Sequence, residues 1–335
     1  MNRVLVPLAL NTASFARARP DRVESLGGRT MGTSWSARLV LPVEVPLDMA
    51  CQHVQSALDQ VVAEMSHWEA ASLLSRVNNA VPGEWRDLPP GFFHVLAAAL
   101  DIARLTDGAY DPTIGPLVDL WGFGPVAARI APPPADAIAE VRECVSWNRL
   151  TLDRDARRVR QPGGCRLDLS AIAKGHGVDR ASAALRGLGI GDFLVEVGGE
   201  LRGEGLKPDG SPWWVTLERP PAATGAGETL IALHQLSVAT SGDYRRYFES
   251  GGRRYSHSID PRTGVPVTNG VVSASVIHNS CMMADVLSTA ITILGAEAGM
   301  ALARAQNLAA LVITADESGG GVREHLSPAL EAMLD

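Results

Sequence analysis

The sequence predicts an α+β fold, a single compact domain in which mixed and antiparallel sheets pack against helices. Stretches with the two-residue period of strands and stretches with the helical period follow one another irregularly, not in the strict alternation of a doubly wound protein. The 335 residues can bury one large core or two smaller ones. Because no internal repeat and no clear linker interrupts them, we expect one domain. A composition of 46% hydrophobic and 20% charged residues is typical of a globular protein.

In the first half of the chain, a strand is expected at residues 27–41, where polar side chains alternate with larger ones. Helices are expected at residues 48–65, 93–106 and 136–145. Residues 109–124 should form a loop, because Pro112, Gly115 and Pro116 stand too close together for a helix to continue. A hairpin should pair residues 150–152 with Val159, and a short buried strand at residues 165–169 should lead into a helix that runs to Leu188.

The second half should be richer in strands. They are expected at residues 193–197, 213–217, 229–233, 236–239, 271–277 and 308–314. A flexible loop is expected at residues 220–228, a turn at residues 240–243, and helices at residues 283–294 and 296–306. We therefore divide the chain into an N-terminal extension at residues 1–26, a domain at residues 27–315 and a C-terminal tail at residues 316–335.

Charge, cysteines and termini exclude several classes of protein. The net charge of −7 argues against broad nucleic-acid binding. The four cysteines are far apart and contain no Cys-x-x-Cys pair, so neither a zinc site nor a disulfide framework is expected. No window reaches the roughly 18 apolar residues of a membrane-spanning helix. The first residues resemble a short signal peptide interrupted by Pro7 and Asn11, so a cytoplasmic location is favoured, and a periplasmic one follows if that segment is cleaved.

The helix expected at residues 283–294 carries an acid and a hydroxyl on one side. Asp285 and Thr289 lie one turn apart, opposite an apolar face. That face is formed by Met283, Val286, Leu287, Ala290 and Leu294. Two stacked hard oxygens suit Mg²⁺ or Ca²⁺ better than zinc. The alternative, which the spacing alone favours, is the ordinary solvated face of an amphipathic helix.

Three further positions have side chains suited to chemistry. His257 stands two residues before an Ile-Asp-Pro turn; an imidazole titrates near neutrality, so it is a candidate general base, or else it stabilises the turn. Trp68 follows the helix at residues 48–65 and is either a core plug or a stacking platform. Asp168 ends a strand that enters a helix carrying Lys174, a usual place to hold a phosphate or a cation. Neither a Walker loop nor a dinucleotide fingerprint occurs in the chain.

Seven segments in a fixed order resemble the ApbE family, the FAD:protein FMN transferases. They are Met31-Gly32-Thr33, Leu74-Ser75-Arg76-Val77-Asn78, and residues 107–124, 168–179, 196–203, 239–242 and 253–294. The resemblance spans residues 27–314 and implies an ApbE-like, T-fold-like architecture. It also implies a Mg²⁺-dependent reaction in which a Thr or Ser hydroxyl of a target protein attacks the FMN-side phosphorus of FAD and AMP leaves. The implied acceptor carries a Ser/Thr-Gly-Ala-Ser/Thr motif.

The resemblance implies roles for individual residues. Asp285 and Thr289 would bind the metal together with the backbone carbonyl of Ala171, and His257 would be the base. The implied FAD-contacting positions are Met31, Trp68, Ala109, Tyr110, Asp111, Asp168, Lys174, His257 and Ile259. Asp260 is expected to orient the turn or the metal shell.

The chain departs from the family pattern at two places. Residues 69–73 replace the frequent Asp-Pro-x-Ser-Glu, and His176 stands where many members have Tyr. Residues 224–227 resemble the acceptor motif but lack its final hydroxyl, so self-flavinylation is not expected. Two other functions stay open: an FAD pyrophosphatase giving FMN and AMP, and a flavin-binding protein without chemistry.

Overall fold

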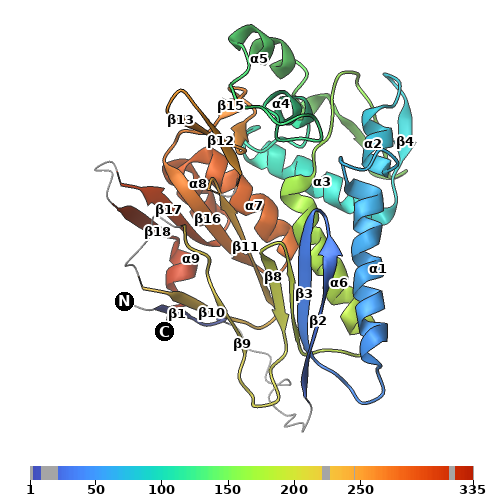
Figure 1. The fold of residues 1–335 in the computed structure, drawn as a ribbon, viewed down its shortest axis with the longest axis vertical. Helices are drawn as coiled ribbons and strands as arrows, with labels where there is room; N and C mark the ends of the chain where they lie inside the picture. The colour runs from blue at the N-terminus through green and yellow to red at the C-terminus, as the bar shows by residue number, and fades with distance from the viewer. Residues whose placement is uncertain (1–2, 9–21, 221–226, 245, 317–320, 335) are drawn as a thin grey trace.

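The computed structural model describes residues 3–8, 22–220, 227–244, 246–316 and 321–334. Its centre is an eight-stranded sheet in the order β18-β17-β16-β11-β8-β7-β3-β2, in which all neighbours are antiparallel. The strands are β2 (Val23–Thr30), β3 (Thr33–Val40), β7 (Phe193–Val197), β8 (Glu200–Glu204), β11 (Leu236–Gly242), β16 (Val271–His278), β17 (Ala309–Ala315) and β18 (Val322–Leu326). Helices and smaller sheets surround it, which confirms the expected α+β fold (Figure 1).

The two faces of the central sheet have different covers. Helices cover one face: α1 (Leu47–Met65), α3 (Pro90–Leu105), α6 (Ser170–Gly187), α7 (Cys281–Leu294) and α8 (Ala296–Ala305). The other face packs against a small sheet and a short helix, namely β1 (Arg3–Leu5), β10 (Thr229–Leu233), β9 (Trp213–Thr216) and α9 (Pro328–Glu331). In β17, Ala310 and Val312 pack with the helices, whereas Leu311 and Ile313 pack with the small sheet. Successive side chains of a strand point to opposite faces, so a strand covered on both sides is apolar throughout.

A third group of elements lies at one end of the molecule, at the top of Figure 1. It contains α4 (Gly115–Leu120), α5 (Ala135–Arg142), the hairpin β12 (Tyr247–Ser250) and β13 (Arg253–Ser256), and the pair β14 (Ile259–Asp260) and β15 (Val265–Pro266). A separate cluster of Leu117, Trp121, Phe123 and Ile259 forms its core. The smaller elements α2 (Leu73–Asn78), β4 (Trp85–Asp87), a 3₁₀ turn (Trp147–Arg149), β5 (Thr151–Asp153) and β6 (Arg158–Arg160) complete the fold.

Most expected elements are present, and four expectations need correction. The strand expected within residues 27–41 is β3, but the sequence did not predict its partner β2; Met31 and Gly32, with φ of 48° and 72°, form the tight turn between them. The loop at residues 109–124 contains α4, since Pro116 lies in its first turn, where no N–H is needed. The strand at residues 165–169 is only a single bridge between Ile114 and Arg166. Residues 240–242 are not a turn but continue β11, which pairs with β16 as far as Gly242.

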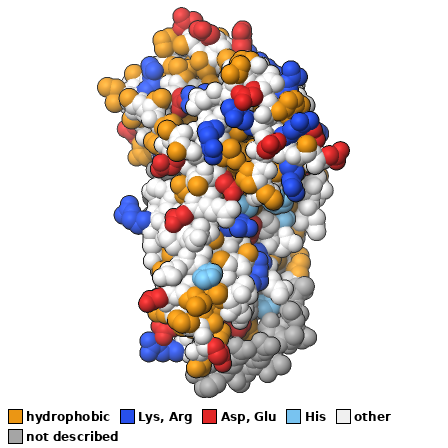
Figure 2. Space-filling model, turned by 90° about the vertical axis from the view of Figure 1, so that its right-hand side faces the viewer, with side chains coloured by type: hydrophobic (Ala, Val, Ile, Leu, Met, Phe, Trp, Pro, Cys, Tyr) orange, Lys and Arg blue, Asp and Glu red, His pale blue; other side chains and the backbone are white. Residues whose placement is uncertain are grey.

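The segments expected to be terminal appendages contribute to the sheets. Within residues 1–26, β1 pairs in parallel with β10 and β2 begins at Val23. Within residues 316–335, β18 forms an edge of the central sheet and α9 packs on β17. Residues 9–21, which belong to the signal-like segment, and residues 221–226, which contain most of the acceptor-like motif, lie outside the described residues. No described helix is long and apolar enough to span a membrane. On the face shown in Figure 2, charged side chains of both signs are interspersed.

Candidate active site

The contact between α6 and α7 brings the predicted metal ligands together. The two helices are antiparallel: the Asp179 carboxylate in α6 accepts hydrogen bonds from the backbone N–H groups of Cys281 (3.0 Å) and Met282 (3.0 Å), which begin α7. One turn earlier in α6, the Gly175 N–H donates to Oδ2 of Asp285 at 2.9 Å. Continued by one more turn, this register places Ala171 opposite Asp285 and Thr289.

Gly175 explains why the two helices approach so closely. A Cβ atom at this position would lie 2.3 Å from the Cys281 carbonyl oxygen and 2.8 Å from Cβ of Asp285. In a regular helix the Gly175 N–H would bond the carbonyl of Ala171, four residues earlier. Because the same N–H donates to Asp285, the Asp285 carboxylate lies against the turn of α6 that follows Ala171. Sequence periodicity could not reveal this contact.

The alternative interpretation of Asp285 as part of a solvated helix face is wrong. Helix α7 is covered by α6, α8 and the strands β11 and β16, and Asp285 is only 4% exposed. Thr289 is half-buried. A carboxylate removed from water in this way needs a compensating donor or cation.

Tyr110 lies within the electrostatic reach of three acids. Burial, and then the negative charges of Asp168, Asp285 and Asp111, raise the pKa of Tyr110 well above 10.0. The hydroxyl is buried and makes no hydrogen bond within the described part of the chain. An orphaned donor among carboxylates indicates a place where a ligand completes the polar contacts.

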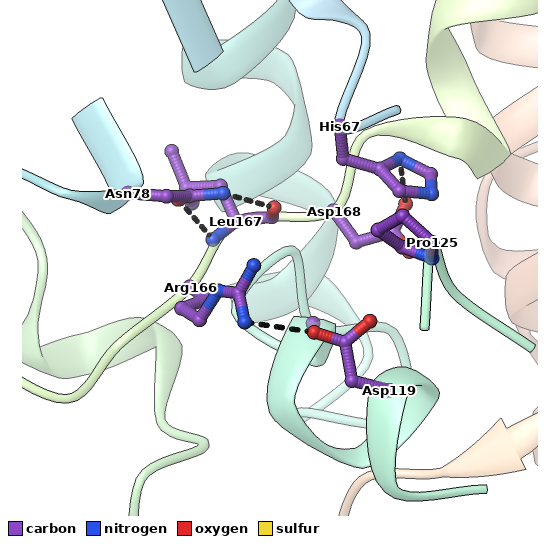
Figure 3. A pocket seen from close by; sticks show the side chains of 8 residues that line it. His67, Asn78, Asp119, Pro125, Arg166, Leu167 and Asp168 are labelled. Carbon is purple, nitrogen blue, oxygen red and sulfur yellow. Dashed lines mark hydrogen bonds and ion pairs between the residues drawn. The ribbon is translucent and has the colours of Figure 1, made fainter. Parts of the chain in front are cut away.

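A small cavity adjoins these acids (Figure 3). It is lined by His67, Asn78, Gly115, Asp119, Pro125, Arg166, Leu167 and Asp168. His67 Nδ1 lies 3.7 Å from Asp168, and Arg166 pairs with Asp119 at 2.8 Å. Asn78 donates to the Leu167 carbonyl (2.9 Å) and accepts from the Leu167 N–H (2.7 Å). These two hydrogen bonds take the place of the inter-strand hydrogen bonds that the expected strand would have made. They hold the segment that leads through Asp168 into α6.

The predicted base is fixed through its backbone and one ring nitrogen. The His257 N–H donates to the Arg246 carbonyl at 3.0 Å, and His257 Nδ1 lies 3.2 Å from the same oxygen. A carbonyl can only accept, so Nδ1 carries the proton and Nε2 is the proton-accepting nitrogen of the neutral ring. The ring lies edge-on to Phe123, two residues from Pro125 in the cavity wall.

The other predicted flavin contacts fall into two groups. Trp68 is 55% exposed with its ring 5.5 Å from that of His67, so it is not a core plug. Lys174 is bound to the buried Glu200 at 2.5 Å. Met31 packs in the core where its side chain lies over Gly177. These three positions surround the first turns of α6 and the end of α1.

The remaining predicted positions are engaged in structure. Both carboxylate oxygens of Asp111 accept hydrogen bonds, from Thr113 (2.8 Å) and from the Trp147 N–H (2.9 Å). Burial raises the pKa of Asp111. Ala109 and Ile259 are buried, so they can offer a ligand backbone atoms or packing, but no polar side chain. Asp260 holds Arg262 through two contacts of 2.9 and 2.8 Å and thereby orients the turn after His257.

Several residues of the site were not singled out from the sequence. They are His67, Asp119, Arg166, Gly175 and Arg246. Gly175 carried a signal, since a glycine inside an otherwise helical segment often marks a close approach. The others carried none, because their roles depend on partners distant in the chain.

Comparison with known proteins gives concordant results. The family model described as the ApbE family matches residues 31–312. An FAD:protein FMN transferase of Vibrio cholerae is 36% identical over 335 residues, covering 100% of this chain and 99% of the relative. One of Haemophilus influenzae is 36% identical, covering 94% and 93%. Among solved structures, the flavin transferase ApbE of Vibrio cholerae has a TM-score of 0.87 at 35% identity, covering 94% of this chain and 100% of that one. The flavinyl transferase ApbE of Pseudomonas stutzeri has a TM-score of 0.85 at 35% identity, with 93% and 97% covered.

Proposed function

The chain belongs to the ApbE family and is a flavin transferase, and we propose that it attaches FMN from FAD to a Thr or Ser hydroxyl of an acceptor protein, releases AMP and requires Mg²⁺. In this reaction the acceptor oxygen bonds to the FMN-side phosphorus while the bond from that phosphorus to the AMP oxygen breaks. The hydroxyl proton passes to a base. The observation that supports this most directly is the buried Asp285 carboxylate, held where α6 meets α7 by the Gly175 N–H.

The oxygens at this contact fit a hard divalent cation. Asp285 supplies a carboxylate, Thr289 a hydroxyl and Ala171 a backbone carbonyl, which is the donor class that Mg²⁺ prefers. Among the described residues, no group of three or more His, Cys, Asp or Glu side chains could hold a metal. A site that relies on one carboxylate, with a hydroxyl and a carbonyl, is compatible with that finding. Bound there, Mg²⁺ would offset the charge of the pyrophosphate.

His257 is the proposed base. Nδ1 lies 3.2 Å from the Arg246 carbonyl and would donate to it, so Nε2 is the nitrogen that would take the proton of the acceptor hydroxyl. The ring is half-buried, edge-on to Phe123, so part of it is exposed toward an acceptor approaching from solvent.

For FAD, we propose contacts along the cavity and the first turns of α6. The exposed ring of Trp68 can stack on a flat ring of the dinucleotide. Lys174, held by Glu200, places positive charge beside the acids of the site. The Tyr110 hydroxyl can donate to a phosphate or ribose oxygen. Met31, Ala109, Asp111, Asp168 and Ile259 complete the proposed set.

The test is to incubate the protein with FAD, Mg²⁺ and a peptide containing Ser-Gly-Ala-Thr, and to measure AMP and peptide-bound flavin. We expect both products in equal amounts. AMP without labelled peptide would instead support an FAD pyrophosphatase. Bound FAD with neither product would support a flavin-binding protein without chemistry.

Two variants separate the metal site from the base. Asp285→Asn should abolish turnover and also the rise in melting temperature that Mg²⁺ gives the wild type. His257→Gln should lose on the order of 10²–10⁴-fold in transfer rate while keeping that Mg²⁺ response. Asp101→Asn, at an exposed acid that pairs with Arg104 and Arg154 at the surface, is the matched control. Full activity of Asp285→Asn would refute the metal assignment.

A further inference from the structure

We propose that the hairpin β12–β13 is the docking surface for the acceptor protein, and that it binds a carboxylate-bearing segment beside the target hydroxyl. The hairpin surface consists of the exposed side chains of Tyr247, Arg253 and Arg254. This inference rests on the proposed function, because it identifies the protein that the proposed base acts upon.

The hairpin is directly connected to the proposed base. His257 follows the last residue of β13, and its N–H bonds the carbonyl of Arg246, which precedes β12. One face of the hairpin is anchored: Phe248 and Tyr255 are cross-strand partners with rings stacked at 5.1 Å, and both pack near Trp121. The Arg246 guanidinium donates to the Phe123 carbonyl at 3.0 Å. These contacts hold the hairpin and His257 as one unit.

The other face is open and rich in groups that bind proteins. Tyr247 is 46% exposed, and the Arg254 guanidinium lies 3.7 Å above its ring. Arg253, two residues before Tyr255 on the same strand, lies on the anchored side, 5.2 Å from the Tyr255 ring, with its side chain exposed at the distal end of the hairpin. Stacked guanidinium groups keep their donors in a fixed plane, which suits bidentate binding of a carboxylate. Tyr and Arg are also the residues enriched at the energetic centres of interfaces.

Neither guanidinium is neutralised by an ion pair within the described residues. Arg254 donates to the Asp243 backbone carbonyl at 3.3 Å, and Glu249, its cross-strand partner, forms no ion pair with it. Residues 246–256 contain three arginines and one glutamate, a net charge of +2, in a chain whose net charge is −7. An acidic segment is therefore attracted to this hairpin and repelled by the molecule as a whole.

The area of a typical protein interface is large enough that an acceptor bound at His257 would also cover the hairpin. A standard interface covers about 800 Å² on each partner, a disc of about 16 Å radius. A strand of four residues extends about 13 Å at about 3.3 Å per residue. A folded acceptor whose hydroxyl reaches His257 thus covers the hairpin that ends there. Tyr247, directly across from Ser256, is the nearest part of this surface.

The test uses three synthetic peptides that share the core Ser-Gly-Ala-Thr, flanked by Asp and Glu, by Ser and Gly, or by Lys. The wild type should have the lowest KM for the acidic peptide. In the double variant Arg253→Glu/Arg254→Glu, the KM for the acidic peptide should rise about tenfold, and the Lys-flanked peptide should become the better substrate. FAD affinity should be the same in both proteins. Arg38→Glu, at an exposed arginine on β3, should retain the wild-type order.

The double variant should become a worse catalyst for the acidic peptide and a better one for the Lys-flanked peptide. A misfolded variant would lose activity toward both peptides, so it cannot give the expected result. Equal KM values of the wild type for all three peptides, with the double variant unchanged, would overturn the docking inference and leave the transferase function intact. Failure of the wild type to label any peptide, with FAD and Mg²⁺ present, would overturn the proposed function and the inference with it.

Discussion

Gly175→Ala tests whether the α6–α7 contact forms the metal site. The added Cβ would lie 2.3 Å from the Cys281 carbonyl oxygen, about 1 Å closer than an ordinary contact, and 2.8 Å from Cβ of Asp285. Both obstacles are backbone or the first atom of a side chain, so no rotamer change can remove them. Helix α7 must move away from α6, and the hydrogen bond from Gly175 to Asp285 must lengthen beyond 3.5 Å or break.

The expected cost follows from three terms. Overpacking of a tight core contact costs about 1–3 kcal/mol. Loss of a donor to a buried carboxylate costs about 1–3 kcal/mol. Replacing glycine by alanine inside a helix stabilises the folded protein by about 1 kcal/mol. The net loss in the free energy of unfolding should therefore be about 1–5 kcal/mol, with Mg²⁺ affinity reduced as Asp285 and Ala171 separate.

Two other glycines of α6 provide matched controls. At Gly187 a Cβ meets nothing within 4 Å, so Gly187→Ala should be neutral or stabilising by up to about 1 kcal/mol. At Gly177 it meets the flexible tip of Met31 at 2.8 Å and Cδ2 of Leu58 at 3.3 Å, so Gly177→Ala should give an intermediate result. Urea unfolding and the Mg²⁺-induced rise in melting temperature are measured for all three. A Gly175→Ala protein with wild-type stability and an unchanged Mg²⁺ response would refute the reasoning.

Two further predictions concern the same pair of helices. Burial lowers the pKa of His176 from 6.5 to about 4, so the unfolded chain binds a proton there that the folded chain does not. The free energy of unfolding should therefore fall as the pH drops from about 6.5 to about 4, by at most about 3 kcal/mol. His176→Gln should reduce this loss, measured by thermal melts across the pH range. The same dependence of melting temperature on pH in the variant and the wild type would contradict the prediction. Asp179→Ala removes the carboxylate that accepts from Ser280 Oγ, Cys281 and Met282 at the start of α7, and should lower the free energy of unfolding by about 2 kcal/mol. Equal denaturation midpoints for Asp179→Ala and the wild type would rule out this capping role.

Local pattern was enough to predict most elements of the fold. The helical period identified α1 and α7, and the apolar strands β7 and β10 have the predicted bounds. The failures have specific causes. Residues 165–169 are apolar like a buried strand, but the Asn78 side chain takes the backbone groups of Leu167 that a neighbouring strand would have used. Gly242 belongs to a strand because its pairing with Ser273 outweighs the turn propensity of the sequence around it.

The roles of side chains near the site also depend partly on residue type and partly on the tertiary structure. The identity of Trp68 allowed a core plug or a stacking platform, and its 55% exposure decides against the plug. The sequence marked Asp111 as a flavin contact by resemblance, yet its carboxylate holds Thr113 and the Trp147 backbone. Neither outcome depends on the residue type alone. Each depends on what lies within hydrogen-bonding or packing distance in three dimensions.

The sequence by itself determined that Asp285 and Thr289 lie one turn apart on the same side of a helix, because that relation follows from the helical period alone. Only the tertiary structure decided that this side is buried, since periodicity orients residues relative to each other but does not identify the neighbouring element. The neighbour is α6, and it can approach because position 175 has no side chain. The same approach directs the Gly175 N–H to Asp285, the carboxylate of the proposed metal site.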